Sequence, residues 1–181
     1  MRKLFISGLL ALSLTSITAQ QYLTRNGTVS FFSETPVENI EAVNNQVSSV
    51  LDLDKGEFAF LVPIKAFAFE KALMQEHFNE NYMESGQYPK ASFKGTIAQA
   101  DALDLSTDGE YPVVFKGIMN IHGTDQEIEE QATLIIKDGK LSLKSAFRLR
   151  PEDYRIKIPA GKRSNIAEIL DISVDIDYEK K

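Results

Sequence analysis

Alternating apolar and polar residues dominate the chain from residue 110 to residue 149. The alternation occurs in three consecutive runs, 113–122, 132–136 and 141–149, and each run has one apolar face. A period of two is typical of β-strands that are buried on one side only. Asp138-Gly139 separates the last two runs, and both residues tolerate the positive φ of a tight hairpin turn. The pattern predicts a meander of antiparallel strands.

Similar runs precede and follow this meander. We predict further strands at 27–33, 38–53, 57–64, 90–98 and 167–178. Within the 38–53 run, Val43, Val47, Leu51 and Leu53 share one parity, so we expect these four side chains to face inward. The turn residues 54–56 then indicate that the second and third runs form a hairpin.

One segment has the period of a helix instead. Between Phe67 and Met83 the apolar residues recur at spacings of three and four, which places them on one helical face. This face carries Phe69, Leu73, Met74, His77, Phe78 and Tyr82. Gly86 follows as a C-terminal capping residue. We predict one main helix that covers an opening of the strand assembly.

About eight strands with one apolar face each have to close on themselves or stack, because an open sheet edge invites aggregation. The fold class is therefore all-β with one helix, and an eight-stranded antiparallel barrel is the expected architecture. Such a barrel can hold one small ligand in its interior. A β-sandwich is the competing architecture, and the long alternation of residues 167–178 favours the barrel.

Residues 1–19 have the features of a secretory signal peptide. Arg2-Lys3 is a short basic start, an apolar stretch runs to Leu14, and small and polar residues lead to Ala19. The apolar stretch is too short for a membrane span, and the rest of the chain contains no second long one. We expect cleavage near Ala19, a barrel domain over residues 20–181, and export to the periplasm.

Charge and cysteine usage narrow the class of partner. Without Arg2 and Lys3 the chain has 18 basic and 26 acidic side chains, a net charge of −8. An acidic surface argues against nucleic acid and against an anionic membrane as the main partner. The sequence has no cysteine, so no disulfide supports the exported domain.

Few residues could carry catalysis or bind a metal. His77 and His122 are the only histidines, and they fall on different predicted elements, a helix face and the outward side of a strand end. A zinc site would need both of them together with carboxylates. The sequence has neither a Gly-x-Ser-x-Gly motif nor a cysteine nucleophile. We predict no catalytic residue, no metal and no cofactor; an enzyme with either histidine as acid or base is the alternative.

Three short motifs resemble the YceI-like family and stand in the family's order. They are Tyr88-Pro89-x-x-x-Phe93, Asn120-Ile121-His122-Gly123-Thr124 and Phe147-x-Leu149-x-x-x-Asp153-Tyr154. The helical stretch 73–78 is also similar to the family's helix. The resemblance covers nearly all of the mature chain. It implies an exported lipocalin-like barrel, and some members bind polyisoprenoids such as isoprenoid quinones or polyprenyl phosphates. Members commonly form dimers, so the resemblance implies a homodimer, while the sequence itself leaves the oligomeric state open.

A barrel of this kind would contact its ligand through the inward apolar residues. The candidates are Phe31, Phe58, Phe60, Phe69, Leu73, Phe78, Phe93, Phe115, Met119, Phe147 and Leu170. Large aromatic rings that pack imperfectly can leave an elongated apolar channel. The alternative is that these phenylalanines simply fill the interior, as side chains commonly do in small barrels.

A basic cluster stands out in this acidic chain. It comprises Arg148, Arg150, Arg155, Lys157, Lys162 and Arg163. Arg155 and Lys157 are the candidates for binding a phosphate or quinone head group at the barrel mouth. The alternative is a solvated loop with salt bridges to Glu152 and Asp153.

These observations predict a non-enzymatic exported protein that carries or sequesters a polyisoprenoid or similar lipid. A ligand-free envelope stress or interaction module is the alternative, and an enzyme acting on a lipid is a third hypothesis.

Overall fold

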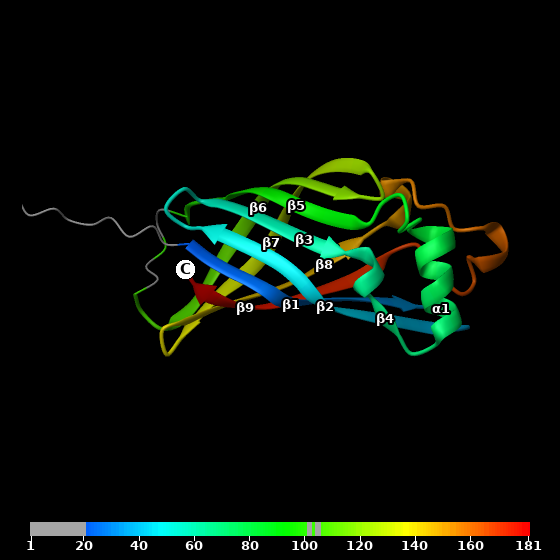
Figure 1. Cartoon of the computed structure of the whole chain (residues 1–181), viewed down its shortest axis with the longest axis horizontal. Coiled ribbons are helices and arrows are strands. Elements are labelled where there is room, and N and C mark those ends of the chain that lie inside the picture. Colours follow the sequence, from blue (N-terminus) through cyan, green and yellow to red (C-terminus); the bar gives the residue numbers. More distant parts are fainter. Residues whose placement is uncertain (1–20, 101–102, 104–105) are drawn as a thin grey trace, which may run out of the picture.

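The computed structural model describes residues 21–100, 103 and 106–181, so the predicted signal peptide lies outside the described residues. The described part of the chain is built mainly of strands (Figure 1). The long strands are β1 (Gln21–Glu34), β2 (Asn39–Asp52), β3 (Glu57–Pro63), β5 (Lys90–Ile97), β6 (Gly109–Ile121), β7 (Thr124–Lys137), β8 (Lys140–Leu149) and β9 (Leu170–Lys180). A two-residue strand, β4 (Ala68–Phe69), pairs with β2.

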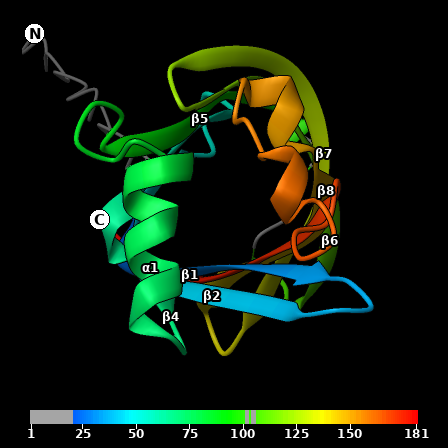
Figure 2. The ribbon, with the colours of Figure 1, turned by 90° about the vertical axis from the view of Figure 1, so that its right-hand side faces the viewer.

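These eight long strands, all of them within the described residues, form a closed antiparallel barrel. The order of hydrogen-bonded neighbours is β1-β9-β8-β7-β6-β5-β3-β2, and a direct pairing of β1 with β2 closes the ring. At the end of the barrel that faces the viewer in Figure 2, the helix α1 (Ala72–His77) lies on one side and the segment after β8 on the other. The predicted barrel is confirmed, and the sandwich is excluded.

The first strand is longer than the sequence pattern predicts. Residues 21–26 were expected to lead into a strand at Gly27, yet β1 begins at Gln21 and pairs with Asp52 of β2. The pairing is irregular on both sides of Gly27. A Cβ at this glycine would meet the Ile176 side chain of β9 at 3.0 Å, so a larger residue there would require that side chain to shift. The irregular register hides the alternation in the sequence.

A local irregularity also reverses the parity of β2. Val47, Leu51 and Leu53 are buried as predicted, but Ala42 and Asn44 are buried in place of Val43. The change occurs where the β1–β2 register shifts. There the Asn44 carboxamide accepts a hydrogen bond from the Gln46 amide at 2.8 Å and donates one to the Pro63 carbonyl at 2.8 Å. Two extra bonds to backbone groups satisfy this buried polar side chain.

The helix is shorter than predicted. The 67–83 helix was expected to begin at Phe67, but the chain there forms a 3₁₀ turn, η1 (Ile64–Ala66), followed by β4. Helical structure starts at Ala72 in α1 and continues through a π-helical turn, η2 (Phe78–Tyr82). Pairing of Phe69 with Ala42 of β2 holds the preceding residues extended. Tertiary pairing therefore overrides the helical period at this end.

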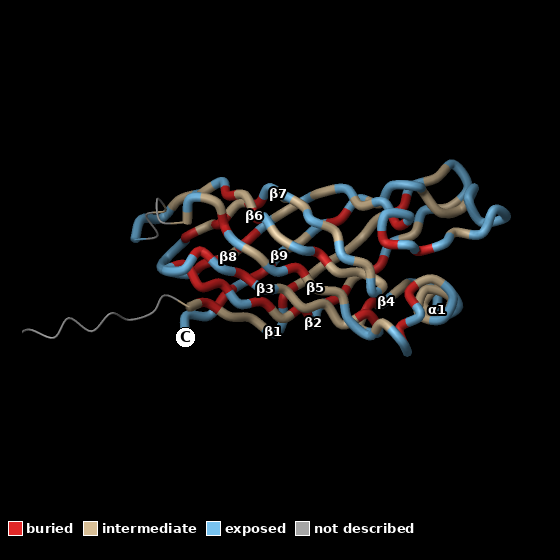
Figure 3. The backbone as a smooth tube through the Cα atoms, turned by 90° about the horizontal axis from the view of Figure 1, so that it is seen from above, coloured by how far each residue is buried: buried red, intermediate tan, exposed pale blue. Residues whose placement is uncertain are grey.

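The barrel interior is packed solid at the end away from α1. Leu51, Leu134, Leu141 and Ile176 are all at most 2% exposed, and none of them lines the cavity described below. In Figure 3 the buried segments run along the barrel toward the end that holds the C-terminus. At this end the phenol oxygen of Tyr178 lies 2.7 Å from the Ser49 hydroxyl, and burial raises the pKa of the tyrosine. These side chains belong to the hydrophobic core, which continues into the other half of the barrel.

Two facing glycines let β5 and β6 approach closely. Gly95 and Gly117 are register partners. A Cβ on either one would overlap the backbone of the other strand, at the carbonyl oxygen of Lys116 or of Lys94. Only glycine fits at these two positions.

Candidate functional site

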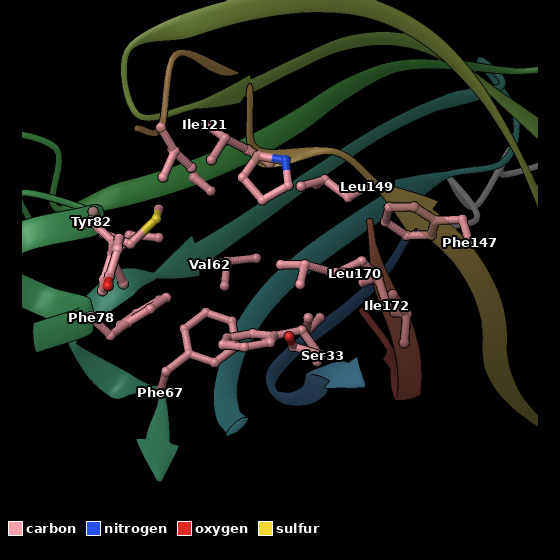
Figure 4. A pocket seen from close by; sticks show the side chains of 18 of the residues that line it. Ser33, Val62, Phe67, Phe78, Tyr82, Ile121, Phe147, Leu149, Leu170 and Ile172 are labelled. Carbon is pink, nitrogen blue, oxygen red and sulfur yellow. The ribbon is translucent and has the colours of Figure 1, made fainter. Parts of the chain in front are cut away.

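The half of the barrel beneath α1 encloses an apolar cavity of about 320 Å³ (Figure 4). This volume is within the range of about 300–1,000 Å³ that is usual for small-molecule sites. The strands supply most of the lining, including Val62, Phe147 and Ile172. The cavity reaches the surface between α1 and the loop that follows η4 (Pro151–Tyr154), since exposed Lys162 of that loop is among the lining residues.

One group of four phenylalanines forms the floor of the cavity. The rings of Phe58, Phe60, Phe93 and Phe115 contact one another, and the centroid of Phe58 lies 4.7 Å from those of Phe93 and Phe115. Three of the four line the cavity, whereas Phe58 is packed behind them and is 5% exposed. The floor separates the cavity from the solid half of the barrel.

A second group of four phenylalanines lies near the mouth. Phe31, Phe67, Phe69 and Phe78 come from β1, the η1–β4 segment and η2, and their ring centroids are 5.0–5.8 Å apart in the contacting pairs. All four line the cavity. Tilted and edge-on ring contacts of this kind stabilise the wall beyond simple burial. The helix is thus attached to the barrel through aromatic packing.

Polar contacts close the rim around the mouth. The Glu38 carboxylate accepts a bond from the Lys71 ammonium at 2.9 Å and another from the Asn165 amide at 3.4 Å. The bond from Lys71 is the main reason that the pKa of Glu38 is lowered. The Ser33 hydroxyl accepts a bond from the Ala167 amide at 2.9 Å. These bonds join the β1–β2 hairpin to the start of α1 and to the loop before β9.

Most of the predicted ligand-contacting residues are brought together around the cavity. Those that line it are Phe31, Phe60, Phe69, Phe78, Phe93, Phe115, Met119, Phe147 and Leu170. Phe58 is not in the lining, and Leu73 is 61% exposed on the outer side of α1. Met74, which shares the predicted apolar face, lines the cavity from α1. Contact with a ligand stays a prediction for all of them.

Sequence reasoning missed part of the lining. Ile156, Ile158 and Ile166 contribute from the loop after η4. The alternation of Ile156 and Ile158 with charged neighbours was a usable signal, but the basic residues and Pro159 around it suggested a solvated loop.

The predicted head-group residues do not reach the cavity. Arg155 and Lys157 are exposed, and neither is in the lining, whereas Lys162 is. Arg163 forms an ion pair with Glu152 at 3.0 Å, as the salt-bridged alternative predicted, and Arg148 pairs with Asp171 at 3.2 Å. A head-group role for Arg155 and Lys157 stays a prediction, without support from their positions.

The two histidines lie in different surroundings. His77 lines the cavity from α1. His122, at a turn with φ of 51°, has its Nε2 atom 2.8 Å from the Glu84 carboxylate, while its buried Nδ1 has no partner. Within residues 21–100, 103 and 106–181, no group of three or more acidic or histidine side chains could hold a metal ion.

Few polar groups reach the cavity. They include Glu130 on β7, whose pKa is raised because the carboxyl is partly removed from water. The site is therefore suited to bind an apolar ligand that makes a small number of polar contacts. In the part of the chain that the structure describes, no helix is long and apolar enough to cross a membrane.

This closed barrel with an apolar cavity belongs to a known class of domain. The YceI-like domain model matches residues 21–178, so the chain is a member of the YceI-like family. The resemblance seen in the sequence is confirmed. A comparison with curated proteins finds no match.

Solved structures share this fold at low sequence identity. A polyisoprenoid binding domain from Saccharophagus degradans, implicated in plant cell wall breakdown, superposes with a TM-score of 0.77 at 13% identity, covering 91% of this chain and all of that one. BcnA of Burkholderia cenocepacia gives 0.70 at 14% identity over 85% of this chain and 96% of its own. The YceI protein of Campylobacter jejuni gives 0.57 at 12% identity, with both chains fully covered.

Proposed function

We propose that this protein binds a polyisoprenoid or a similar long apolar lipid in the cavity beneath α1, and that it carries or sequesters this ligand without transforming it. The observation that carries the proposal is the cavity itself, a space of about 320 Å³ walled by aromatic and aliphatic side chains inside a closed barrel. Membership of the YceI-like family, and the polyisoprenoid binding named for one solved relative, support the same ligand class.

Binding would be driven by the apolar area that the tail removes from water. Each buried methylene contributes about 0.8 kcal/mol before the costs of association are subtracted. Aromatic walls suit a branched unsaturated chain, because flat rings accommodate methyl branches without requiring polar partners. The cavity holds part of a long chain, and the remainder would leave through the mouth between α1 and Lys162.

We further propose that the protein acts after export, with residues 1–19 removed. The basic start, apolar stretch and small residues before Ala19 support this location. Expression of the full chain in a Gram-negative host, followed by fractionation and N-terminal sequencing, tests it. A mature protein that begins after Ala19 in the periplasmic fraction is expected, and an uncleaved cytoplasmic protein would contradict it. Light scattering on the same sample tests the expected homodimer.

Ligand identity is tested on the same preparation. The protein is purified without detergent, extracted with organic solvent and analysed by mass spectrometry. We expect an isoprenoid or similar lipid at near-stoichiometric amount. Repeated empty extracts, together with no binding of added isoprenoids to the purified protein, would favour a ligand-free interaction module.

A further inference from the structure

Glu130 is an acidic residue on the inner face of the barrel. It stands between Ile128 and Ala132 on β7, and its register partner on β6 is Phe115 of the cavity floor. The Glu130 side chain lines the main cavity and also a smaller neighbouring one of about 130 Å³. A carboxyl among apolar side chains is costly unless something compensates it.

No protein group compensates this carboxyl in the described part of the chain. Glu130 has no hydrogen bond or ion pair there, and removal from water is the sole cause of its raised pKa. Lys116 on β6 is engaged with the outward-facing Glu129 at 2.8 Å. The Glu130 carboxyl is thus an acceptor that faces the cavity without a donor.

A second polar group lies beside it. Tyr154 of η4 lines the smaller cavity together with Glu130 and is 4% exposed. Burial, and then the negative charges of Asp153 and Glu130, raise the pKa of its phenol to about 12, so the hydroxyl keeps its proton at neutral pH. Within the described part of the chain, this hydroxyl makes no hydrogen bond to another residue. An acceptor and a donor therefore face the same space.

The separation of β7 from β8 creates this space. The ladder between the two strands begins at Thr133 and Lys144 and runs to the hairpin, so Glu130 lies beyond it. The Ser145 hydroxyl bridges the start of the gap by donating to the Gln131 carbonyl at 2.6 Å, and η4 packs against β7 further along. The gap leaves room for a polar group beside the apolar cavity.

We propose that Glu130 and the Tyr154 hydroxyl bind the polar head of the ligand and select a head that donates a hydrogen bond, as a terminal hydroxyl does. This inference rests on the proposed lipid-binding function and names the head-group class for the same cavity. A hydroxyl can donate to the Glu130 carboxylate and accept from Tyr154 at the same time. A phosphate would meet like charge, and a quinone carbonyl could satisfy only Tyr154.

The charged residues around the smaller cavity do not favour an anion. Arg148 is engaged with Asp171 at 3.2 Å. Arg150 and Asp153 are both exposed at the edge of the smaller cavity and carry opposite charges. Among the charged side chains that line the smaller cavity, Glu130 is half-buried, whereas Arg148, Arg150 and Asp153 are exposed.

Three ligands that share the same C15 chain and differ only in their head group test the inference. Their affinities are measured by calorimetry on delipidated protein at pH 7.5. The probes are farnesol, farnesyl methyl ether, which cannot donate, and farnesyl phosphate. We expect farnesol to bind about ten- to a hundredfold more tightly than the ether, because a carboxylate left without its donor loses a charged hydrogen bond. The phosphate should also bind more weakly than farnesol.

Variants then test whether Glu130 and Tyr154 are responsible for the preference for farnesol over the ether. Glu130→Leu should bind farnesol and the ether equally, and Tyr154→Phe should weaken farnesol binding, while Glu127→Leu, on the outward face of the same strand, should keep the wild-type preference. Equal binding of all three probes to the wild-type protein, or tightest binding of the phosphate, would overturn the head-group assignment and leave lipid binding intact. Failure to bind any of the probes would overturn the proposed function as well.

Discussion

Filling the cavity should affect ligand binding and stability in opposite directions. Val62 on β3 is half-buried, lies opposite Ala91 of β5, and points into the cavity (Figure 4). Val62→Phe places an aromatic ring in that space without a loss of strand propensity, because phenylalanine is as well suited to strands as valine. The new ring takes room that a ligand tail would occupy.

The magnitudes follow from the size of the change. If the ring displaces only two ligand carbons, the lost burial is about 1.6 kcal/mol, or about a fifteenfold weaker affinity. The ligand-free protein should gain about 0.5–2 kcal/mol, as is usual for cavity-filling substitutions. In a domain of this size each kcal/mol raises the midpoint of thermal unfolding by about 2–4 °C.

Two measurements on delipidated protein check this expectation. Calorimetry with farnesol gives the affinity, and thermal unfolding followed by circular dichroism gives the stability. Val50→Phe is the matched control, since Val50 is on the adjacent strand β2 but 46% exposed to solvent. The control should change neither quantity appreciably. If Val62→Phe binds farnesol as the wild type does, the ligand does not occupy this cavity and the reasoning fails.

Three further changes test the fold and the electrostatics. Gly117→Ala should lower the free energy of unfolding in urea by about 3 kcal/mol or more, because its methyl group would overlap the β5 backbone. Gly86→Ala, with nothing within 4 Å of its Cβ, should be nearly neutral. Equal effects of the two substitutions would contradict the close strand approach. Tyr178→Phe should lose about 1–3 kcal/mol by leaving the Ser49 hydroxyl buried and unpaired, and an unchanged urea midpoint would refute this. Burial raises the pKa of Glu130 above its ordinary 4.5, so the folded state binds this proton more tightly and stability falls as pH rises above that value. Glu130→Gln should therefore stabilise the protein at pH 7.5 and not at pH 4, and an equal effect at both would contradict the assignment.

The fold was predictable from the sequence because most of the long strands keep one apolar parity wherever their register is regular. The predictions failed where backbone irregularities intervene. Val43 was assigned inward because the shift beside Asn44 cannot be seen in a binary pattern. The start of α1 was misplaced because the pairing of β4 with β2 is a contact between segments distant along the chain. Such effects depend on neighbours that one segment does not reveal.

The cavity was only partly predictable. Parity identifies inward residues, but it does not distinguish a residue that lines a space from one packed behind it, as Phe58 is. Glu130 follows Glu127 and Glu129 and so resembles part of an acidic surface run, although its own parity is that of Ala132 and Leu134. A carboxyl on the apolar parity of a strand was the signal that could have found it.

The barrel interior is divided into a solid half and a hollow half, and this division has an evolutionary consequence. Leucine and isoleucine side chains around Leu134 pack between the strands at one end, while the residues that would contact a ligand lie at the other. Under the proposed function, substitutions of cavity residues would alter which ligand fits while leaving the buried side chains around Leu134 unchanged. A lineage with this architecture would then be able to change its ligand by small steps, without first having to acquire spare stability.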